Sequence, residues 1–187
     1  MRNTQPTLRE AELLHVLSAE GVVAVPAEAV WGLSCDPWSW HAVSELLALK
    51  QRPVNKGLIL VGSDMQQFSH LLSTLSARDQ QTVALSWPGS NTWLVPNRGI
   101  YPPWVTGDHD EVAIRVTSAP NLARLCSHWG GPLVSTSANP AGAQPANLRA
   151  QVVRYFGTSL PAAAGAVQRS GRPSIIRRLE TGEVLRA

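Results

Sequence analysis

At 187 residues, 44% hydrophobic and 16% charged, with a formal net charge of +3, the chain is predicted to form one domain, residues 1–187, with a sizeable core. It has no run of eighteen apolar residues and no apolar signal region at its N-terminus, which argues against a membrane segment. Two cysteines, Cys35 and Cys126, are too few for a disulfide framework, so we expect a reducing, cytoplasmic setting.

The first predicted element is a helix that begins with a capping box, Thr7 to Glu10, and ends near Gly21. A buried strand over residues 21–26 follows, and Ser39 can cap a second helix that runs to about residue 50. Further along, we expect strands at 57–61, 91–96, 111–116 and 132–139, helices at 64–73, 76–86, 118–128 and 147–156, and a hairpin at 175–187.

Strands alternate with helices over the first two-thirds of the chain, and paired strands come near its end. This order predicts the α/β class, with a twisted mixed sheet and flanking helices. The sequence shows no internal repeat and no long linker, which again indicates a single domain.

Three cations gather where the second helix gives way to the next strand, at Lys50, Arg52 and Lys56. Lys50 can complement the helix dipole, and the other two can be ordinary surface charges. Alternatively, Pro53 biases Arg52 to an extended conformation, so that Lys50 and Arg52, two residues apart, project to one side and grip a polyanion. No glycine-rich phosphate loop is present.

Two other stretches have polar groups where a ligand can bind. The segment 135–139 ends a strand in hydroxyl and amide side chains, which bind phosphate or carboxylate or simply form a capped turn. Arg115 lies within an apolar strand, where it either needs a buried anionic partner or faces solvent opposite Ile114 and Val116.

Hydrolytic chemistry is not supported, because the five histidines are scattered and no zinc motif or catalytic triad is evident. Residues 140–187 hold seven arginines and two glutamates, against nine cations and eleven acids in 1–139. This basic quarter is either a phosphate-binding footprint or a solvated face. Cations and polar turns without a nucleophile indicate anion binding or nucleotidyl transfer.

Five segments stand in a characteristic order: VPAEAVWGL (25–33), LKQRPVNKGLIL (49–60), WPGSNTWL (87–94), VAIRV (112–116) and LVSTSAN (133–139). With Lys50-Gln51-Arg52 as Lys-x-Arg and Ser137-Ala138-Asn139 as Ser-x-Asn, the sequence resembles the YrdC-like family of threonylcarbamoyl-AMP synthases, in its short single-domain bacterial form. The resemblance implies a twisted mixed α/β sheet with a basic concave cleft.

The resemblance also implies a nucleotidyltransferase that makes L-threonylcarbamoyladenylate and pyrophosphate from L-threonine, bicarbonate and ATP, with Mg²⁺ on the ATP phosphates. The product would serve the threonylcarbamoyl modification of adenosine 37 in tRNAs that read ANN codons, through separate transfer proteins. The family is also associated with double-stranded RNA binding and ribosome maturation.

The resemblance assigns roles residue by residue. Lys50 and Arg52 are the expected catalytic cations, and they neutralise the triphosphate together with Arg115. The remaining expected contacts to substrate or nucleotide are Lys56, Thr136, Ser137, Asn139, Ser174 and Arg186.

Three departures from the family pattern fall near the expected cleft: Ala27 replaces a threonine, Ser90-Asn91 replaces Pro-(Val/Leu), and Ala141 replaces a serine. The lost hydroxyls are expected to weaken threonine binding or to change the amino acid. They keep open the alternative of a double-stranded RNA-binding or ribosome-maturation protein on the same fold, with weak or no catalysis.

Overall fold

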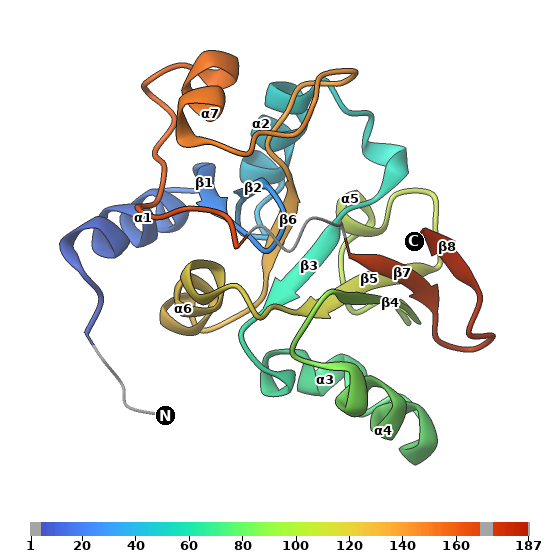
Figure 1. Ribbon diagram of the computed structural model, residues 1–187. Coiled ribbons are helices and arrows are strands. Elements are labelled where there is room, and N and C mark those ends of the chain that lie inside the picture. Colours follow the sequence, from blue (N-terminus) through green and yellow to red (C-terminus); the bar gives the residue numbers. More distant parts are fainter. Residues whose placement is uncertain (1–4, 169–173, 187) are drawn as a thin grey trace.

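The computed structural model describes residues 5–168 and 174–186 (Figure 1). The helices are α1 (Leu8–Ser18), α2 (Trp40–Lys50), α3 (Ser69–Leu72), α4 (Ala77–Ser86), α5 (Pro103–Thr106), α6 (Pro120–Trp129) and α7 (Arg149–Phe156), with 3-10 turns η1 (Val54–Lys56) and η2 (Met65–Phe68). The strands are β1 (Val23–Pro26), β2 (Trp31–Ser34), β3 (Ile59–Gly62), β4 (Asn91–Pro96), β5 (Glu111–Val116), β6 (Leu133–Ser137), β7 (Ile175–Arg178) and β8 (Val184–Arg186).

The eight strands form one sheet in the order β1-β2-β6-β3-β5-β4-β7-β8. The pairs β3–β5 and β4–β7 are parallel, and the other neighbours are antiparallel. The predicted α/β class with a mixed sheet is therefore confirmed. The β7–β8 hairpin, red in Figure 1, forms the edge of the sheet opposite β1.

One face of the sheet carries the larger part of the core. Register places Leu60 beside both Val134 and Ile114, so these three side chains point to the same face. They pack in one cluster with buried side chains from the helices, among them Leu46 of α2 and Val83 of α4. These helices cover that face and keep it from water.

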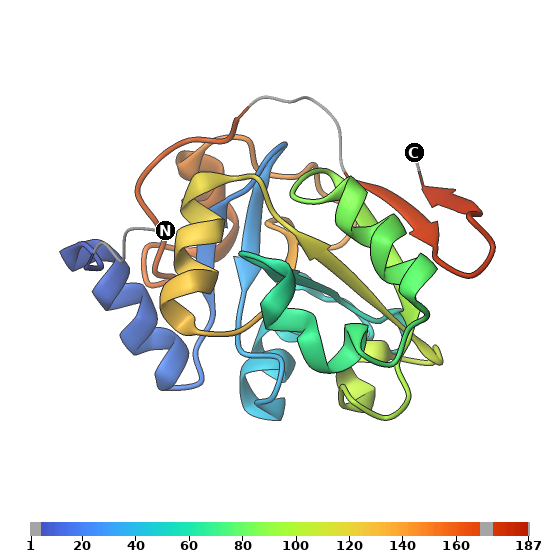
Figure 2. The same cartoon turned by 90° about the horizontal axis from the view of Figure 1, so that it is seen from below.

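The opposite face is covered at one end. Val61 and Leu133 pair across β3 and β6 and point to this face, where they pack with Leu17 of α1 and Leu125 of α6. Figures 1 and 2 show α1 and α6 side by side next to β1. Arg115, which pairs with Val61 in register, lies on the same face beyond this helical cover, so the site described below forms on it.

Local signals set the helix ends as the sequence indicates. The Thr7 side chain accepts from the Glu10 backbone N–H while Glu10 reaches back to Thr7, and the Ser39 side chain caps α2 by accepting from the Ala42 N–H. At its other end α2 stops at Gln51, which has a left-handed backbone with φ of 52°. The extended run expected over Lys50 to Arg52 is therefore wrong, because Lys50 is the last helical residue and Gln51 turns the chain.

One strand and one α-helix were not predicted. Strand β2 contains a glycine and lacks apolar alternation, while α5 is a single turn that begins at Pro103. The segment expected as one helix at 64–73 is divided between η2 and α3. Within residues 5–168 and 174–186, none of the helices has the length and apolar character needed to cross a membrane.

Candidate active site

A cavity of about 680 Å³ opens on the sheet face that α1 and α6 leave uncovered. Strands from both halves of the sheet contribute to it, with Gly32 on β2, Ile59 on β3, Leu94 on β4 and Ile176 on β7. Its ionisable lining residues are Glu28, Arg52, Lys56, His109, Glu111, Arg115, Arg178 and Arg186, and its hydroxyl-bearing ones are Ser90, Thr106, Ser135, Thr136, Ser137 and Ser174. The cavity thus joins an apolar floor to a predominantly cationic wall.

Arg52 and Lys56 lie at one side of this wall. The Arg52 guanidinium donates to the backbone oxygen of Gly57 at 2.9 Å, and its buried Nε has no hydrogen-bond partner among the described residues. Burial lowers the pKa of Arg52. Gly57 has a φ of 61°, and a Cβ there would lie 2.7 Å from the Thr106 oxygen, so a glycine lets the chain pass close to α5.

Lys50 is buried behind the cavity wall, with 5% of its surface exposed. Its ammonium donates to the backbone oxygens of Ser137 and of Asn139, the latter at 3.0 Å, and its own carbonyl accepts from the Ala141 N–H at 2.9 Å. Burial and the nearby charge of Arg52 lower the pKa of Lys50 to about 8. Lys50 therefore ties the end of α2 to the turn that follows β6.

The turn after β6 is held together by its own side chains. The Ser137 hydroxyl donates to the Asn139 side-chain oxygen at 2.6 Å, and the Asn139 amide donates to the oxygens of Pro140 and Ala143 at 3.1 and 2.8 Å. Ser137 lines the cavity, whereas Asn139 and Lys50 are not among its described lining residues. Asn139 thus fixes the shape of the turn that presents Ser137.

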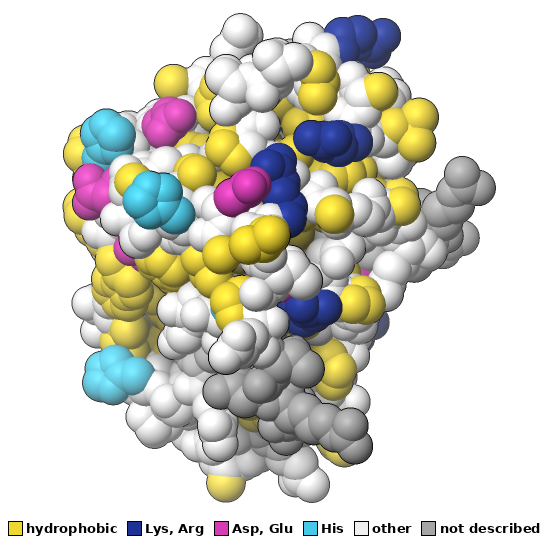
Figure 3. All heavy atoms as spheres, turned by 90° about the vertical axis from the view of Figure 1, so that its left-hand side faces the viewer, with side chains coloured by type: hydrophobic (Ala, Val, Ile, Leu, Met, Phe, Trp, Pro, Cys, Tyr) yellow, Lys and Arg dark blue, Asp and Glu magenta, His cyan; other side chains and the backbone are white. Residues whose placement is uncertain are grey.

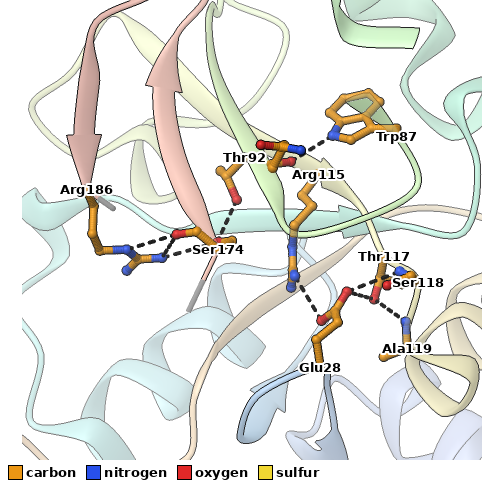
Figure 4. A network of polar contacts seen from close by, with 10 residues as sticks. Glu28, Trp87, Thr92, Arg115, Thr117, Ser118, Ala119, Ser174 and Arg186 are labelled. Atoms are coloured by element: carbon orange, nitrogen blue, oxygen red, sulfur yellow. Dashed lines mark hydrogen bonds and ion pairs between the residues drawn. The ribbon is translucent and has the colours of Figure 1, made fainter. Parts of the chain in front are cut away.

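Arg115 and Glu28 form a buried ion pair in the cavity wall, with Nη1 and Oε2 2.8 Å apart (Figure 4). Glu28 also accepts from the Thr117 hydroxyl at 2.7 Å and from the Ser118 N–H at 3.1 Å. Burial by itself would raise the pKa of Glu28, but Arg115 and these hydrogen bonds outweigh it and hold that pKa below its usual range. Arg115 is thus paired rather than solvent-facing, which settles the two alternatives that its strand left open.

A third group lies where β7 and β8 meet the cavity. Thr92 donates to the Ser174 hydroxyl at 2.9 Å, and Arg186 donates to the backbone oxygen of Ser174 at 3.0 Å and to its hydroxyl at 3.1 Å (Figure 4). Burial and the charge of Arg115 lower the pKa of Arg186. Both arginines line the cavity, where an anion between them would lower the repulsion of their charges.

A profile of the family described as "Telomere recombination", the Sua5, YciO and YrdC proteins, matches residues 15–187. The chain belongs to this family. The threonylcarbamoyl-AMP synthase of Stutzerimonas stutzeri is 52% identical over 95% of this chain and 96% of that protein. The one of Saccharophagus degradans is 46% identical over 100% of this chain and 98% of that protein.

Solved structures show the same fold. Sua5 of P. abyssi, complexed with L-threonine, matches with a TM-score of 0.84 at 22% identity over 96% of this chain. This chain spans 54% of the length of that protein. YciO of E. coli matches with a TM-score of 0.83 at 18% identity, over 97% of this chain and 90% of that one.

The departures from the family pattern do not all reach the cavity. Ala27 and Ser90 line it, and Ala27 is almost fully buried. Asn91 instead donates to the Ser86 backbone oxygen at 3.3 Å, and Ala141 is exposed with its N–H bonded to Lys50. Of the changed positions, Ala27 and Ser90 therefore lie at the cavity, whereas Asn91 and Ala141 are not among the residues that line it in the described part of the chain.

Several lining groups were missed from the sequence. Glu28 was noted only as part of a motif, although a buried Arg115 demanded an anionic partner and Glu28 follows a strand end. The sequence gives no signal for the ion pair of Glu111 and Arg178, whose Oε2 and Nε lie 3.1 Å apart. Only the order of strands in the sheet brings β5 and β7 near each other. The arginines at 169 and 172, counted in the basic quarter, lie outside the described residues.

Proposed function

We propose that this protein is a threonylcarbamoyl-AMP synthase, which makes L-threonylcarbamoyladenylate and pyrophosphate from L-threonine, bicarbonate and ATP. The observation that carries the proposal is the near full-length identity of about half the residues to relatives of that name. The cavity supports it, because cations from four separate segments face one space large enough for a nucleotide and an amino acid.

The chemistry requires anions to meet. The threonine amine takes up bicarbonate with loss of water to give a carbamate, whose oxygen attacks the α-phosphorus of ATP as pyrophosphate leaves. Arg52, Arg115 and Arg186 lower the repulsion between the carbamate and the triphosphate, and they favour the charge that develops on the leaving group. Lys56 extends this cationic wall at the exposed rim.

Hydroxyl groups supply the orientation. Ser137 is proposed to hydrogen-bond the nucleotide, with its hydroxyl oxygen free to accept because its proton is given to Asn139, and Thr136 and Ser174 are proposed to contact threonine. All three line the cavity. Lys50 and Asn139 are proposed to act mainly through the turn that presents Ser137. Direct contact between the Lys50 ammonium and the triphosphate stays a prediction.

Mg²⁺ fits this site as a companion of ATP rather than as a resident ion. The described carboxylates of the cavity, Glu28 and Glu111, are each paired with an arginine. Residues 5–168 and 174–186 contain no group of three or more metal-binding side chains. Mg²⁺ would be held chiefly by phosphate oxygens and water, and when bound it withdraws charge from the phosphates.

The wider setting follows from this reaction. The adenylate is a reactive mixed anhydride, so we propose that separate transfer proteins consume it to modify tRNA position 37 in a cytoplasmic setting. Direct contact with tRNA or double-stranded RNA is the alternative role. On the face in Figure 3, cationic and acidic side chains are interspersed. Arg124 of α6 is also paired with Glu10 of α1, which neutralises part of the positive charge. This face gives the RNA alternative no continuous basic band among the described residues.

The proposal is tested by incubating the purified protein with ATP, L-threonine and bicarbonate. We expect pyrophosphate release that requires all three substrates and stops when threonine or bicarbonate is omitted. Release that ignores threonine would contradict the proposed amino-acid substrate. Absence of release, together with salt-sensitive binding of double-stranded RNA, would favour the alternative role.

A further inference from the structure

The Glu28 carboxylate is a buried charge in the cavity wall, and it takes no part in any step of the proposed reaction. It is 3% exposed, and it lies in the loop that connects β1 to β2. An acid is a poor contact for a triphosphate, since like charges repel. Its position among phosphate-binding cations therefore requires another explanation.

Glu28 is itself held rigidly. One carboxylate oxygen accepts from the Thr117 hydroxyl and the Ser118 N–H, at 2.7 and 3.1 Å. These two residues directly follow β5, the strand that bears Arg115. The other oxygen meets Arg115 Nη1 at 2.8 Å. Glu28 thus braces the arginine against the end of the arginine's own strand.

The brace leaves another edge of the guanidinium unsatisfied. Arg115 is 8% exposed and lines the cavity, and its buried Nε has no hydrogen-bond partner among the described residues. A buried N–H without an acceptor is costly, so such a group in a cavity wall indicates an absent ligand atom. An anionic oxygen is the acceptor that suits a guanidinium best.

We propose that Glu28 is a positioning residue, which orients Arg115 so that its Nε edge meets an anionic oxygen of bound ATP. An arginine stem has several rotatable bonds, and a buried guanidinium without a counter-charge would turn toward solvent. Glu28 removes that freedom before the nucleotide arrives. The inference rests on the proposed function only in naming ATP as the anion.

The test compares ATP affinity by calorimetry in Glu28→Gln, Arg115→Gln and the double variant. Glutamine keeps the size of Glu28 but loses its charge, and its amide faces groups that donate to the carboxylate. We expect Glu28→Gln and Arg115→Gln each to weaken ATP binding about ten- to hundredfold, since a hydrogen bond to a charged group is lost. The double variant should bind ATP no worse than Arg115→Gln alone, because Glu28 acts through Arg115.

Thermal unfolding separates positioning from a merely structural role. The double variant removes both buried charges, so it should recover melting temperature relative to Glu28→Gln without recovering ATP affinity. The matched control is Glu10→Gln, which removes an ion-paired carboxylate outside the cavity and should leave ATP affinity unchanged.

Arg115→Gln with unaltered ATP affinity, or a further loss on adding Glu28→Gln to it, would overturn the proposal. The proposed function fails separately if the unaltered protein binds ATP but releases no pyrophosphate with threonine and bicarbonate. In that case the affinity comparison still decides the role of Glu28. If the unaltered protein does not bind ATP at all, both are overturned.

Discussion

Arg52 and Ala27 show how single side chains set the properties of this cavity. Arg52 donates to backbone oxygens and is only half-buried, so its contacts contribute little to folding. Ala27 is nearly buried and apolar at a position where a hydroxyl would face the cavity. One residue supplies charge for the polyanion, and the other limits the hydrogen bonds open to the amino acid.

Arg52→Ala is expected to lower the rate of adenylate formation about tenfold to hundredfold, with little change in melting temperature. The reason is that its contacts to phosphate oxygens form only when the nucleotide is bound. Pyrophosphate release and thermal unfolding measure the two effects. Arg78→Ala, an exposed change on α4, is the control and should alter neither. If Arg52→Ala leaves turnover unchanged, Arg52 is an ordinary surface cation and not a contact to the nucleotide.

Ala27→Thr is expected to lower the KM for L-threonine roughly two- to tenfold, the worth of one neutral hydrogen bond. ATP binding should hardly change, because the added hydroxyl is uncharged. Steady-state kinetics with each substrate varied in turn provide the measurement. If the KM for threonine does not move, Ala27 is not a substrate contact.

Lys50 gives a pH dependence whose sign follows from its pKa. The folded chain holds this proton to about pH 8, whereas the unfolded chain holds it to the ordinary value of 10.5. Between these values unfolding takes up a proton, so raising the pH stabilises the folded state through this group. The difference in unfolding free energy between the unaltered protein and Lys50→Met should therefore shift in favour of the former as pH rises from 8 toward 10.5. A flat difference across that window would show an unshifted pKa.

At the scale of elements, the end of α2 decides how the cations are presented. Gln51 adopts a left-handed conformation, and its N–H bonds back to the carbonyls of Leu47 and Ala48. This turn leaves Lys50 on the helix, behind the cavity wall, and brings Arg52 to the wall itself. The geometry follows from one backbone angle, which the spacing of the two cations cannot reveal.

Gln51→Gly is expected to stabilise the protein by about 1 kcal/mol, because glycine adopts the left-handed region without the steric cost of a Cβ. Gln51→Val should be destabilising for the converse reason. Urea unfolding of the two variants provides the measurement. Loss of stability in Gln51→Gly would show that this conformation is not strained.

The sequence predicts elements well where a local signal exists. Local features of the sequence predicted the helix caps at Thr7 and Ser39 and the final hairpin. The structure confirms each of them. Strand β2 was missed, because its short sequence contains a glycine and no apolar alternation, and only its pairing with β1 and β6 identifies it. The site behaves likewise. Arg52, Lys56 and Arg115 were found by motif, whereas the Glu28 partner depends on the long-range contact between a loop and β5.

At the scale of the whole molecule, the sheet order creates the site. Strand β5 lies between β3 and β4, and β7 and β8 follow on the far side of β4, so Arg115 and Arg186 line one cavity from distant parts of the chain. Helices α1 and α6 cover one end of the same face (Figure 2), and the cavity lies beyond them. The fold thus concentrates positive charge in one cavity on a chain of modest net charge.

The most direct test of this role follows carbon from bicarbonate into the product. The protein is incubated with ATP, L-threonine and ¹³C-labelled bicarbonate, and the nucleotides formed are analysed by mass spectrometry. We predict L-threonylcarbamoyladenylate that carries the label, with its yield greatly reduced in Arg52→Ala. Failure to detect any labelled adenylate with folded, ATP-binding protein would contradict the assignment of this cavity to adenylate synthesis.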